Sequence, residues 1–245
     1  MSDQPLLELR GVSKTFGAVH ALTRVDMTAR AGEVVALVGD NGAGKSTLIK
    51  GVAGIYEFDE GEILWEGAPV SIASPKDAAR LGIEVVYQDL ALCDNLDVVE
   101  NMFLGREAVS SFRRLDETSM ERQARETLAS LAVTTLQSVR NPVASLSGGQ
   151  RQSVAVAKAV MWNSKLVILD EPTAALGVAQ TRQVLDLVKR LGQNGLAVIL
   201  ISHNLHDVFE VADRITVLRL GQNVADLKVS ETTQQAVVQE ITAGT

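Results

Sequence analysis

The stretch VVALVGDNGAGKST, residues 34–47, decides the fold that the sequence predicts. Its first part, Val34 to Val38, is a continuous apolar run, rich in β-branched residues, of the kind found in strands buried on both faces. The remainder, GDNGAGKST, matches the pattern G-x-x-x-x-G-K-[ST], and a helix is expected to begin near Ser46. The stretch therefore predicts an α/β protein with a phosphate-binding loop at the end of a buried strand.

The loop between strand and helix has the chemistry of a phosphate cradle. Its glycines let successive backbone N–H groups converge on phosphate oxygens, and the positive end of the following helix adds to the attraction. Lys45 is expected to reach the outer phosphates of a nucleotide, and the hydroxyl of Ser46 is expected to bind Mg²⁺. A glycine-rich turn with an incidental lysine is the alternative, and the position of the motif between strand and helix disfavours it. The predicted nucleotide-binding residues are Gly39, Asp40, Asn41, Gly42, Ala43, Gly44, Lys45, Ser46 and Thr47.

Further strand-like runs complete the predicted sheet. Three runs share the apolar character of residues 34–38, and helical segments lie between them, which predicts a mainly parallel sheet. They are residues 83–86, 166–169 and 197–201, with residues 215–220 and 224–227 closing the sheet. Earlier runs, separated by turn residues such as Gly11 and Gly17, predict an antiparallel β edge. They are residues 6–12, 18–22 and 25–29.

Residues 71–160 are rich in helix formers, and Met120, Ala124 and Leu128 recur at four-residue spacing. Pro142 and a Ser/Gly cluster end this region, after which a helix is expected to restart at Gly148 or Gly149. We therefore predict a single domain, residues 1–245, with an inserted helical subdomain. The core comprises about 1–87 and 161–245, and the helical subdomain comprises about 88–160.

The composition limits the classes of protein to which the chain can belong. It is 46% hydrophobic and 22% charged, as in ordinary globular proteins, and no stretch approaches the ~20 apolar residues that span a bilayer. The formal net charge is -7, so no nucleic-acid partner is expected. Cys93 is the only cysteine, which predicts neither an internal disulfide nor a cysteine-based zinc site. The amino terminus, MSDQPLLELRG, carries Asp3 and Glu8 and does not resemble a secretory signal, so the cytoplasm is the expected location.

Two carboxylates follow the buried run 166–169. Asp170 and Glu171 stand where this strand leaves the sheet, beside the crevice in which α/β proteins bind ligands. Asp170 is expected to hold Mg²⁺ or its water, and Glu171 is expected to polarise the water that attacks the γ-phosphorus. Solvated acids at a turn are the alternative. The phosphate loop favours the functional interpretation because the two motifs serve one reaction.

Residues 146–150 read LSGGQ, and at this motif the chain resembles the ABC ATPases. Ser147 and Gly149 lie at the start of a helix whose free N–H groups form a second anion site. The resemblance implies that this site caps the γ-phosphate of ATP held by a facing subunit, so that the chain works as a homodimer. The capping residues are Ser147, Gly148, Gly149 and Gln150.

The rest of the family pattern extends from Leu6 to about Leu227. The resemblance implies that Phe16 stacks on adenine, although an aromatic ring that only packs is the alternative. It also implies that Gln88 contacts Mg²⁺ and reports the nucleotide state to a membrane partner, and that His203 touches the γ-phosphate. Gly177 departs from the pattern, because the family often has an aspartate there that reaches across the dimer.

The resemblance therefore implies a P-loop NTPase of the ABC type, with a RecA-like core and an inserted helical subdomain, that binds ATP and Mg²⁺ and hydrolyses ATP. The implied catalytic residues are Lys45, Gln88, Glu171 and His203. The implied metal ligands are Ser46, Gln88 and Asp170.

The segment QDLALCDNLDVVENMFLGRE, residues 88–107, resembles bacterial monosaccharide importers of the ribose and xylose type, as do GDNGAGKST and EPTAALG. In such importers this segment flanks a groove that receives a short cytoplasmic helix of the permease. The resemblance implies a peripheral subunit at the cytoplasmic face of the cell membrane that powers import of a monosaccharide such as xylose. Its implied partners are a multi-span membrane permease and, indirectly, an extracytoplasmic solute-binding protein.

Several alternatives stay open at this point. Sugar ATPases of this type usually carry two fused nucleotide-binding domains, whereas this chain has one, which favours a homodimer in the assembled complex. The chain is otherwise compatible with an ABC ATPase in translation or DNA repair, with a subunit of an importer or exporter for another solute, and with a non-hydrolysing nucleotide sensor.

Overall fold

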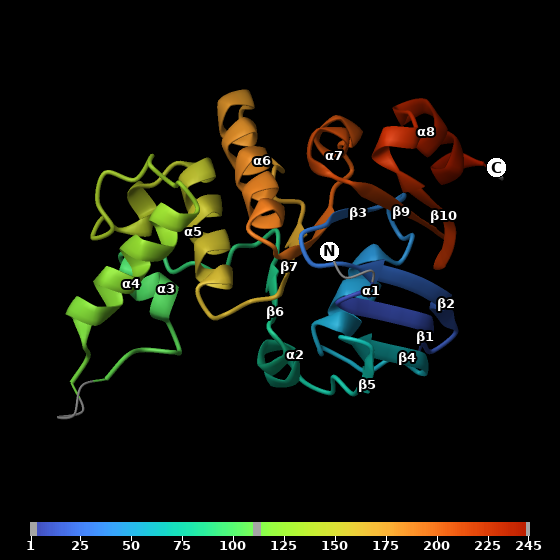
Figure 1. Ribbon diagram of the computed structural model, residues 1–245, viewed down its shortest axis with the longest axis horizontal. Helices are drawn as coiled ribbons and strands as arrows, with labels where there is room; N and C mark the ends of the chain where they lie inside the picture. Colours follow the sequence, from blue (N-terminus) through green and yellow to red (C-terminus); the bar gives the residue numbers. More distant parts are fainter. Residues whose placement is uncertain (1–3, 110–113, 244–245) are drawn as a thin grey trace.

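Two β-sheets form the centre of the molecule in the computed structural model, which describes residues 4–109 and 114–243 (Figure 1). Asp3, used above in reading the amino terminus, lies outside the described residues. The larger sheet has the strand order β10-β9-β3-β8-β7-β6. Its strands are β3 (Val34–Val38), β6 (Ile83–Val86), β7 (Leu166–Asp170), β8 (Ala197–Ile201), β9 (Arg214–Arg219) and β10 (Gln222–Lys228).

The run that decides the predicted fold becomes the central strand of this sheet. β3 lies between β8 and β9 and is parallel to both, and all five of its residues are buried. Alternate side chains face opposite layers: Val34, Ala36 and Val38 pack with one core cluster, and Val35 and Leu37 pack with the other. The α/β class and the mainly parallel sheet are thus confirmed.

The antiparallel strands form a second sheet of their own, with the order β2-β1-β4-β5. These strands are β1 (Leu7–Phe16), β2 (Val19–Ala29), β4 (Glu60–Trp65) and β5 (Ala68–Val70). The sequence predicts two separate strands at 18–22 and 25–29, but β2 is continuous. Arg24 has a φ of 50° and its N–H donates to Ser13 Oγ at 3.1 Å, so the polar pair at 23–24 makes an irregularity within the strand instead of a turn.

A buried arginine ties the two sheets together. Arg214 at the start of β9 donates to Glu33 at 2.8 Å, to Asp226 of β10 at 2.8 Å and to the Thr28 carbonyl of β2 at 2.7 Å. Because each donor of the guanidinium finds an oxygen, this buried charge is compensated. The position of β2 relative to the larger sheet is therefore fixed.

Helices cover the larger sheet on both faces. One face packs against α1 (Lys45–Val52), α2 (Pro75–Leu81) and the antiparallel sheet, and the remaining helices belong to the cluster on the other face. These are α3 (Val98–Phe103), α4 (Glu117–Ser130), α5 (Gly148–Val160), α6 (Val178–Gln193), α7 (Leu205–Val211) and α8 (Gln234–Thr242). Short 3₁₀ helices occupy Val143–Ser145 and Val229–Glu231. No helix among the described residues is long and apolar enough to span a bilayer.

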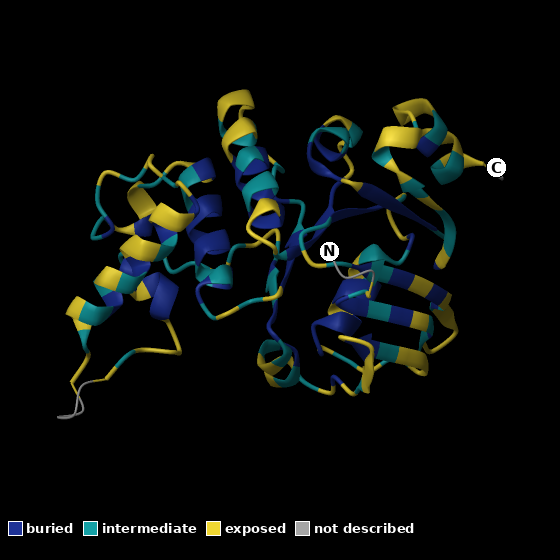
Figure 2. Ribbon diagram, in the orientation of Figure 1, coloured by how far each residue is buried: buried dark blue, intermediate teal, exposed yellow. Residues whose placement is uncertain are grey.

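Helices α3, α4 and α5 gather on the side of the larger sheet away from the antiparallel sheet (Figure 1). Their inward faces are buried and their outward faces are exposed (Figure 2). Met120, Ala124 and Leu128 of α4 are buried, as their four-residue spacing predicts, and α5 begins at Gly148, also as predicted. The division into a core of about 1–87 and 161–245 and a helical subdomain of about 88–160 stays a proposal, to which this arrangement lends support.

Candidate functional site

The loop from Gly39 to Gly44 curves tightly between β3 and α1. Gly39 and Gly44 have φ values of 148° and 102°, which side chains other than glycine rarely tolerate. Neighbouring backbone also leaves no room for a Cβ, since one at Gly39 would overlap the carbonyl oxygen of Leu218 and one at Gly44 would lie 2.8 Å from the carbonyl oxygen of Ala21. The glycines are thus required by this loop's shape, which leaves the backbone N–H groups at the start of α1 accessible to an anion.

Lys45, the first residue of α1, closes over the loop. Its Nζ donates to the carbonyl oxygens of Gly39 at 2.6 Å and Asp40 at 2.9 Å. Burial lowers the pKa of Lys45, and the negative charges of Glu171, Asp40 and Asp170 oppose that shift. The ammonium group is therefore held at the rim of the loop, facing the acid pair.

The acid pair stands at the end of β7. Burial, followed by the negative charge of Glu171, raises the pKa of Asp170, while Lys45 and Lys50 act in the opposite direction. Glu171 has a φ of 50°, and its N–H donates to the carbonyl oxygen of Ile201 at 3.0 Å. This left-handed conformation is strained for a residue with a side chain, and it turns the chain sharply after the strand.

His203 approaches Glu171 from the end of the neighbouring strand, β8. Its Nδ1 lies 2.8 Å from Oε2 of Glu171, with the histidine side chain 74% exposed and the glutamate side chain 16% exposed. The geometry suits an Nδ1–H that donates to the carboxylate, which leaves Nε2 on the exposed side of the ring. The imidazole thus stands at the boundary between the carboxylate and solvent.

Glu171 and His203 line one open cleft of about 610 Å³, whereas Lys45, Ser46 and Asp170 are not among its lining residues. Three of the predicted catalytic residues, Gln88, Glu171 and His203, come together there with the start of the phosphate loop. The lining residues are Val38, Gly39, Asp40, Asn41, Gln88, Glu171, Ala174, Ser202, His203, Leu205, Val238, Ile241 and Thr242. The last three belong to α8, whose part in the cleft the sequence did not reveal, because an amphipathic helix near the end of a chain carries no nucleotide motif.

Phe16 lies at the end of β1 and is 47% exposed. Its ring meets that of Tyr56 edge to face at 5.3 Å, and the Tyr56 hydroxyl donates to the carbonyl oxygen of Thr47 in α1 at 2.7 Å. The exposed ring is thereby fixed relative to the phosphate loop. Sequence reasoning missed Tyr56, since a lone tyrosine carries no specific signal.

The LSGGQ residues form a separate helix start. Ser147 caps α5: its Oγ accepts from the Gln150 N–H at 3.3 Å, and Gln150 Oε1 accepts from the Ser147 N–H at 2.9 Å. A Cβ on Gly148 would lie 2.8 Å from Leu176. None of these residues lines the cleft around Glu171, and α5 lies well apart from α1 (Figure 1). One chain therefore carries two helix starts with predicted anion-binding motifs, and the two do not meet.

Gly177 is the N-cap of α6 and has an extended φ of -74°. Nothing lies within 4 Å of a Cβ built there, so the position has room for the aspartate that the family pattern often has. The absence of that side chain does not reshape the turn.

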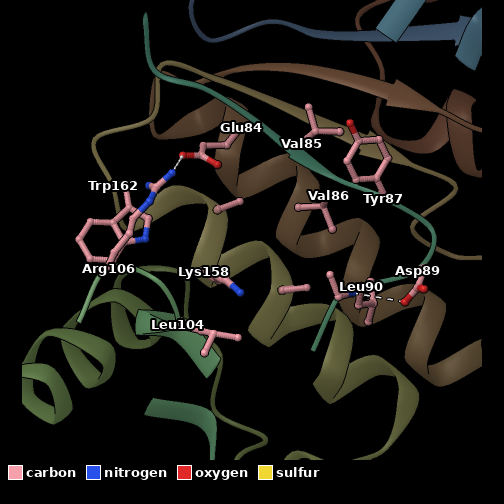
Figure 3. A pocket seen from close by; sticks show the side chains of 13 residues that line it. Glu84, Val85, Val86, Tyr87, Asp89, Leu90, Leu104, Arg106, Lys158 and Trp162 are labelled. Atoms are coloured by element: carbon pink, nitrogen blue, oxygen red, sulfur yellow. Dashed lines mark hydrogen bonds and ion pairs between the residues drawn. The ribbon is translucent and has the colours of Figure 1, made fainter. Parts of the chain in front are cut away.

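A second hollow, of about 220 Å³, lies between the end of β6 and α5, next to Gln88 in the chain (Figure 3). Arg106 there donates to Glu84 at 3.0 Å, and its guanidinium carbon lies 5.2 Å from the ring centre of Trp162. Burial lowers the pKa of Lys158, whose ammonium points into this hollow (Figure 3). Within the described part of the chain, no carboxylate lies within ion-pair distance of Lys158. We call this hollow the Lys158 groove.

A sequence model of the family described as "ABC transporter" matches residues 22–174, more than half of the chain. The fructose import ATP-binding protein FrcA of Rhizobium meliloti is 48% identical over 97% of this chain and 94% of its own length. The xylose/arabinose import ATP-binding protein XylG of Sulfolobus acidocaldarius is 46% identical over 99% of this chain and 95% of its own length. The ribose import ATP-binding protein RbsA of Caldanaerobacter subterraneus is 40% identical over 96% of this chain, which spans only 47% of that relative.

Solved structures show the same arrangement. The ADP conformation of an ATP-binding cassette of an ABC transporter superposes with a TM-score of 0.83 at 25% identity, covering 98% of this chain and 96% of that one. A dimeric post-hydrolysis cassette bound to ADP and Pi gives a TM-score of 0.75 at 25% identity, covering 91% of this chain and 98% of that one.

Proposed function

The chain belongs to the ABC transporter family, and from that membership we propose that it is the ATP-hydrolysing subunit that powers import of a monosaccharide. One observation carries the proposal: the start of the phosphate loop, Gln88, Glu171 and His203 converge on one cleft, as an ATPase requires. Two relatives that align with this chain over nearly their whole length are named as sugar import ATP-binding proteins.

In the proposed reaction the chain holds ATP by its phosphates and activates water. The N–H groups of the loop and the Lys45 ammonium bind the β- and γ-phosphates, and Phe16 stacks on adenine. The Glu171 carboxylate accepts a proton from the water whose oxygen bonds to the γ-phosphorus, while the bond from that phosphorus to the bridging oxygen breaks and ADP leaves. Lys45 and His203 then stabilise the negative charge that develops on the transferred phosphoryl group.

Mg²⁺ fits the oxygen donors beside the loop. The hydroxyl of Ser46, the amide of Gln88 and the carboxylate of Asp170 are hard oxygen ligands, and the described residues include no cluster of three acids, histidines or cysteines that would form a complete metal cage. This donor set suits an ion held by one or two protein groups, waters and nucleotide phosphates. Bound there, Mg²⁺ would neutralise phosphate charge.

The LSGGQ residues at the start of α5 suggest how two copies of the chain would assemble. Because Ser147 to Gln150 lie outside the cleft of their own chain, we propose that they cap the γ-phosphate of ATP in a second copy. Two chains then sandwich two ATP molecules, and hydrolysis reopens the pair. A related cassette is described as dimeric in a state bound to ADP and Pi, which supports this form.

The Lys158 groove is the proposed contact with the permease. It lies beside Gln88, so a change at the nucleotide can reach it through a short segment of chain. Its half-buried ammonium has no carboxylate within ion-pair distance among the described residues, and Leu104 offers an exposed apolar side chain. We propose that a cytoplasmic helix of the permease enters with an acidic and an apolar residue, which places the chain at the cytoplasmic face of the membrane. An extracytoplasmic solute-binding protein would complete the importer.

The relatives are named for different cargoes, namely fructose, xylose or arabinose, and ribose. Xylose is one candidate within this class, and the cargo is chosen by the permease and the solute-binding protein. An ABC ATPase in translation or repair has less support, since the related proteins named above are import subunits.

The test is ATP hydrolysis by the chain assembled with its permease, with and without each candidate sugar and its binding protein. Glu171→Gln should lower the rate by about 10²–10⁴-fold, or about 3–5 kcal/mol in activation free energy, while ATP still binds. Glu126→Gln makes the same change on the exposed face of α4 and should leave the rate at the wild-type level. Equal hydrolysis by wild type and Glu171→Gln would refute the assignment of the base, and an assembly that no monosaccharide stimulates would refute the proposed cargo class.

A further inference from the structure

One buried carboxylate has no part in the reaction just described. Asp207 and Arg214 are the only charged residues that are buried among those the structure describes, and Arg214 is compensated by Glu33 and Asp226. Asp207 has no such cation, because the nearest basic group, Nδ1 of His206, is 4.0 Å away on a side chain that is 80% exposed. The charge of Asp207 therefore needs another explanation.

Asp207 contacts the turn that carries the proposed catalytic base. Its Oδ2 accepts a hydrogen bond from Oγ1 of Thr173 at 2.7 Å. Thr173 follows Glu171 by two residues, with Pro172 between them. Asp207 itself stands in the first turn of α7, where the helix N–H groups favour a negative charge.

The turn at Glu171 is one that the chain does not adopt without support. Glu171 and Ala175 have φ values of 50° and 60°, both left-handed and both strained for residues with a Cβ. Within the turn, the Ala174 N–H donates to the Glu171 carbonyl oxygen at 3.1 Å. A strained segment of this kind persists when its surroundings hold it in place.

The segment from β8 to α7 provides that support at three points. The Ile201 carbonyl oxygen binds the Glu171 N–H, His203 contacts the Glu171 carboxylate, and Asp207 binds the Thr173 hydroxyl. The first two contacts fix the base itself, and the third fixes the direction in which the chain leaves it. Of the two side-chain contacts, that of Asp207 is the less exposed: the Asp207 side chain is 5% exposed, whereas the His203 side chain is 74% exposed.

We propose that Asp207 is a positioning residue for Glu171: through Thr173 it holds the strained turn so that the base faces the attacking water. This role rests on the proposed function and adds to it a residue outside the nucleotide cleft. A buried carboxylate bonded to one neutral hydroxyl is a costly way to stabilise a fold, because an apolar pair of similar volume avoids the desolvation of the charge. A short, directional hydrogen bond to a defined point of the turn is what the carboxylate supplies.

The test compares variants of Thr173 in the full chain. Thr173→Val keeps the shape of the side chain and removes the donor, so kcat should fall by about 10–100-fold while the dissociation constant for ATP changes by less than about threefold. Thr173→Ser restores the hydroxyl and should recover kcat to within about threefold of wild type. The double variant Thr173→Val with Asp207→Ala should lose little more than Thr173→Val alone, since the two residues act as a unit.

Val208→Ala controls for stability. Val208 is fully buried in α7, the helix that also carries Asp207. This variant should therefore lower Tm without removing the hydrogen bond between Thr173 and Asp207. Below its unfolding temperature it should hydrolyse ATP faster than Thr173→Val. A wild-type rate for Thr173→Val, or an equal loss for Val208→Ala, would overturn the positioning role and leave the ATPase intact. A wild-type chain that hydrolyses no ATP would overturn the proposed function as well.

Discussion

Nδ1 of His203 and Oε2 of Glu171 lie 2.8 Å apart, at the ends of the adjacent parallel strands β8 and β7. The parallel register sets this contact, because Asp170, the last residue of β7, pairs with Ile201, the last residue of β8. Each side chain therefore leaves its strand at the same edge of the sheet.

His203→Gln should lower kcat by about 10²–10³-fold with little change in ATP affinity, because the ring orients the carboxylate and faces developing phosphoryl charge. Steady-state hydrolysis and equilibrium binding of a fluorescent ATP analogue check the two parts. His206→Gln, on the exposed neighbouring histidine, is the matched control. Hydrolysis by His203→Gln at the rate of that control would contradict the role of His203.

Asp170→Asn should raise stability at neutral pH while abolishing hydrolysis. Burial and Glu171 raise the pKa of Asp170, so between its usual value of 3.8 and the raised value the folded chain binds more protons than the unfolded chain. Stability due to this group therefore falls as pH rises through that window. The gain in Tm, about 2–4 °C for each kcal/mol, should be full above the raised pKa and vanish toward pH 3.8. Thermal denaturation across pH checks this, and a gain independent of pH would contradict it.

Lys158→Glu should weaken assembly with the permease, since the half-buried ammonium is replaced by a charge that repels the acidic residue proposed for the partner helix. Co-purification from membranes in mild detergent measures the loss, which should exceed about tenfold in recovered permease. Lys76→Glu makes the same charge change on the exposed face of α2 and should co-purify as wild type does. Recovery of permease equal for both variants would place the contact elsewhere.

Asn101→Leu should cost about 2–4 kcal/mol, or roughly 5–15 °C in Tm. Asn101 is fully buried, and its amide group donates to the carbonyl oxygens of Cys93, Leu96 and Asp97 and accepts from the Cys93 N–H. Leucine keeps the volume but leaves these buried backbone groups without a partner. Asn95→Leu, at an exposed position in the loop that precedes α3, should change stability by less than about 0.5 kcal/mol. Differential scanning calorimetry of the two variants measures the difference in Tm, and an equal Tm for both would contradict the role of the Asn101 amide.

The sequence predicted the larger sheet well because its strands are buried on both faces. Val34–Val38 and Ala197–Ile201 read as unbroken apolar runs, and the structure makes them neighbours. It gave no signal for β4 or β5, since Glu60, Gly61 and Glu62 open β4 with exposed residues. Such a strand is specified by its pairing with β1. This pairing is a tertiary contact, and it produces no alternating hydrophobic pattern in the local sequence.

The candidate site divides in the same way. Motif residues such as Lys45 and Glu171 were predicted because their chemistry demands fixed spacing along the chain. Tyr56, Asp207 and the α8 residues were not predicted. Each is brought to the site by the tertiary fold and belongs to no motif with a fixed spacing along the chain. Asp207 is thus a residue that only the structure connects to the proposed base, whereas His203, which also contacts that base, lies in a recognisable motif.

The separation of the phosphate loop from the LSGGQ helix start predicts how two mutant alleles behave when they are expressed together. A chain damaged at Lys45 keeps a sound Ser147, and a chain damaged at Ser147 keeps a sound Lys45. In the proposed sandwich, a mixed pair of these two chains has one composite site with both defects and one with none. Two alleles that each abolish transport should therefore complement one another when expressed in the same cell, whereas two alleles that both damage Lys45 should not.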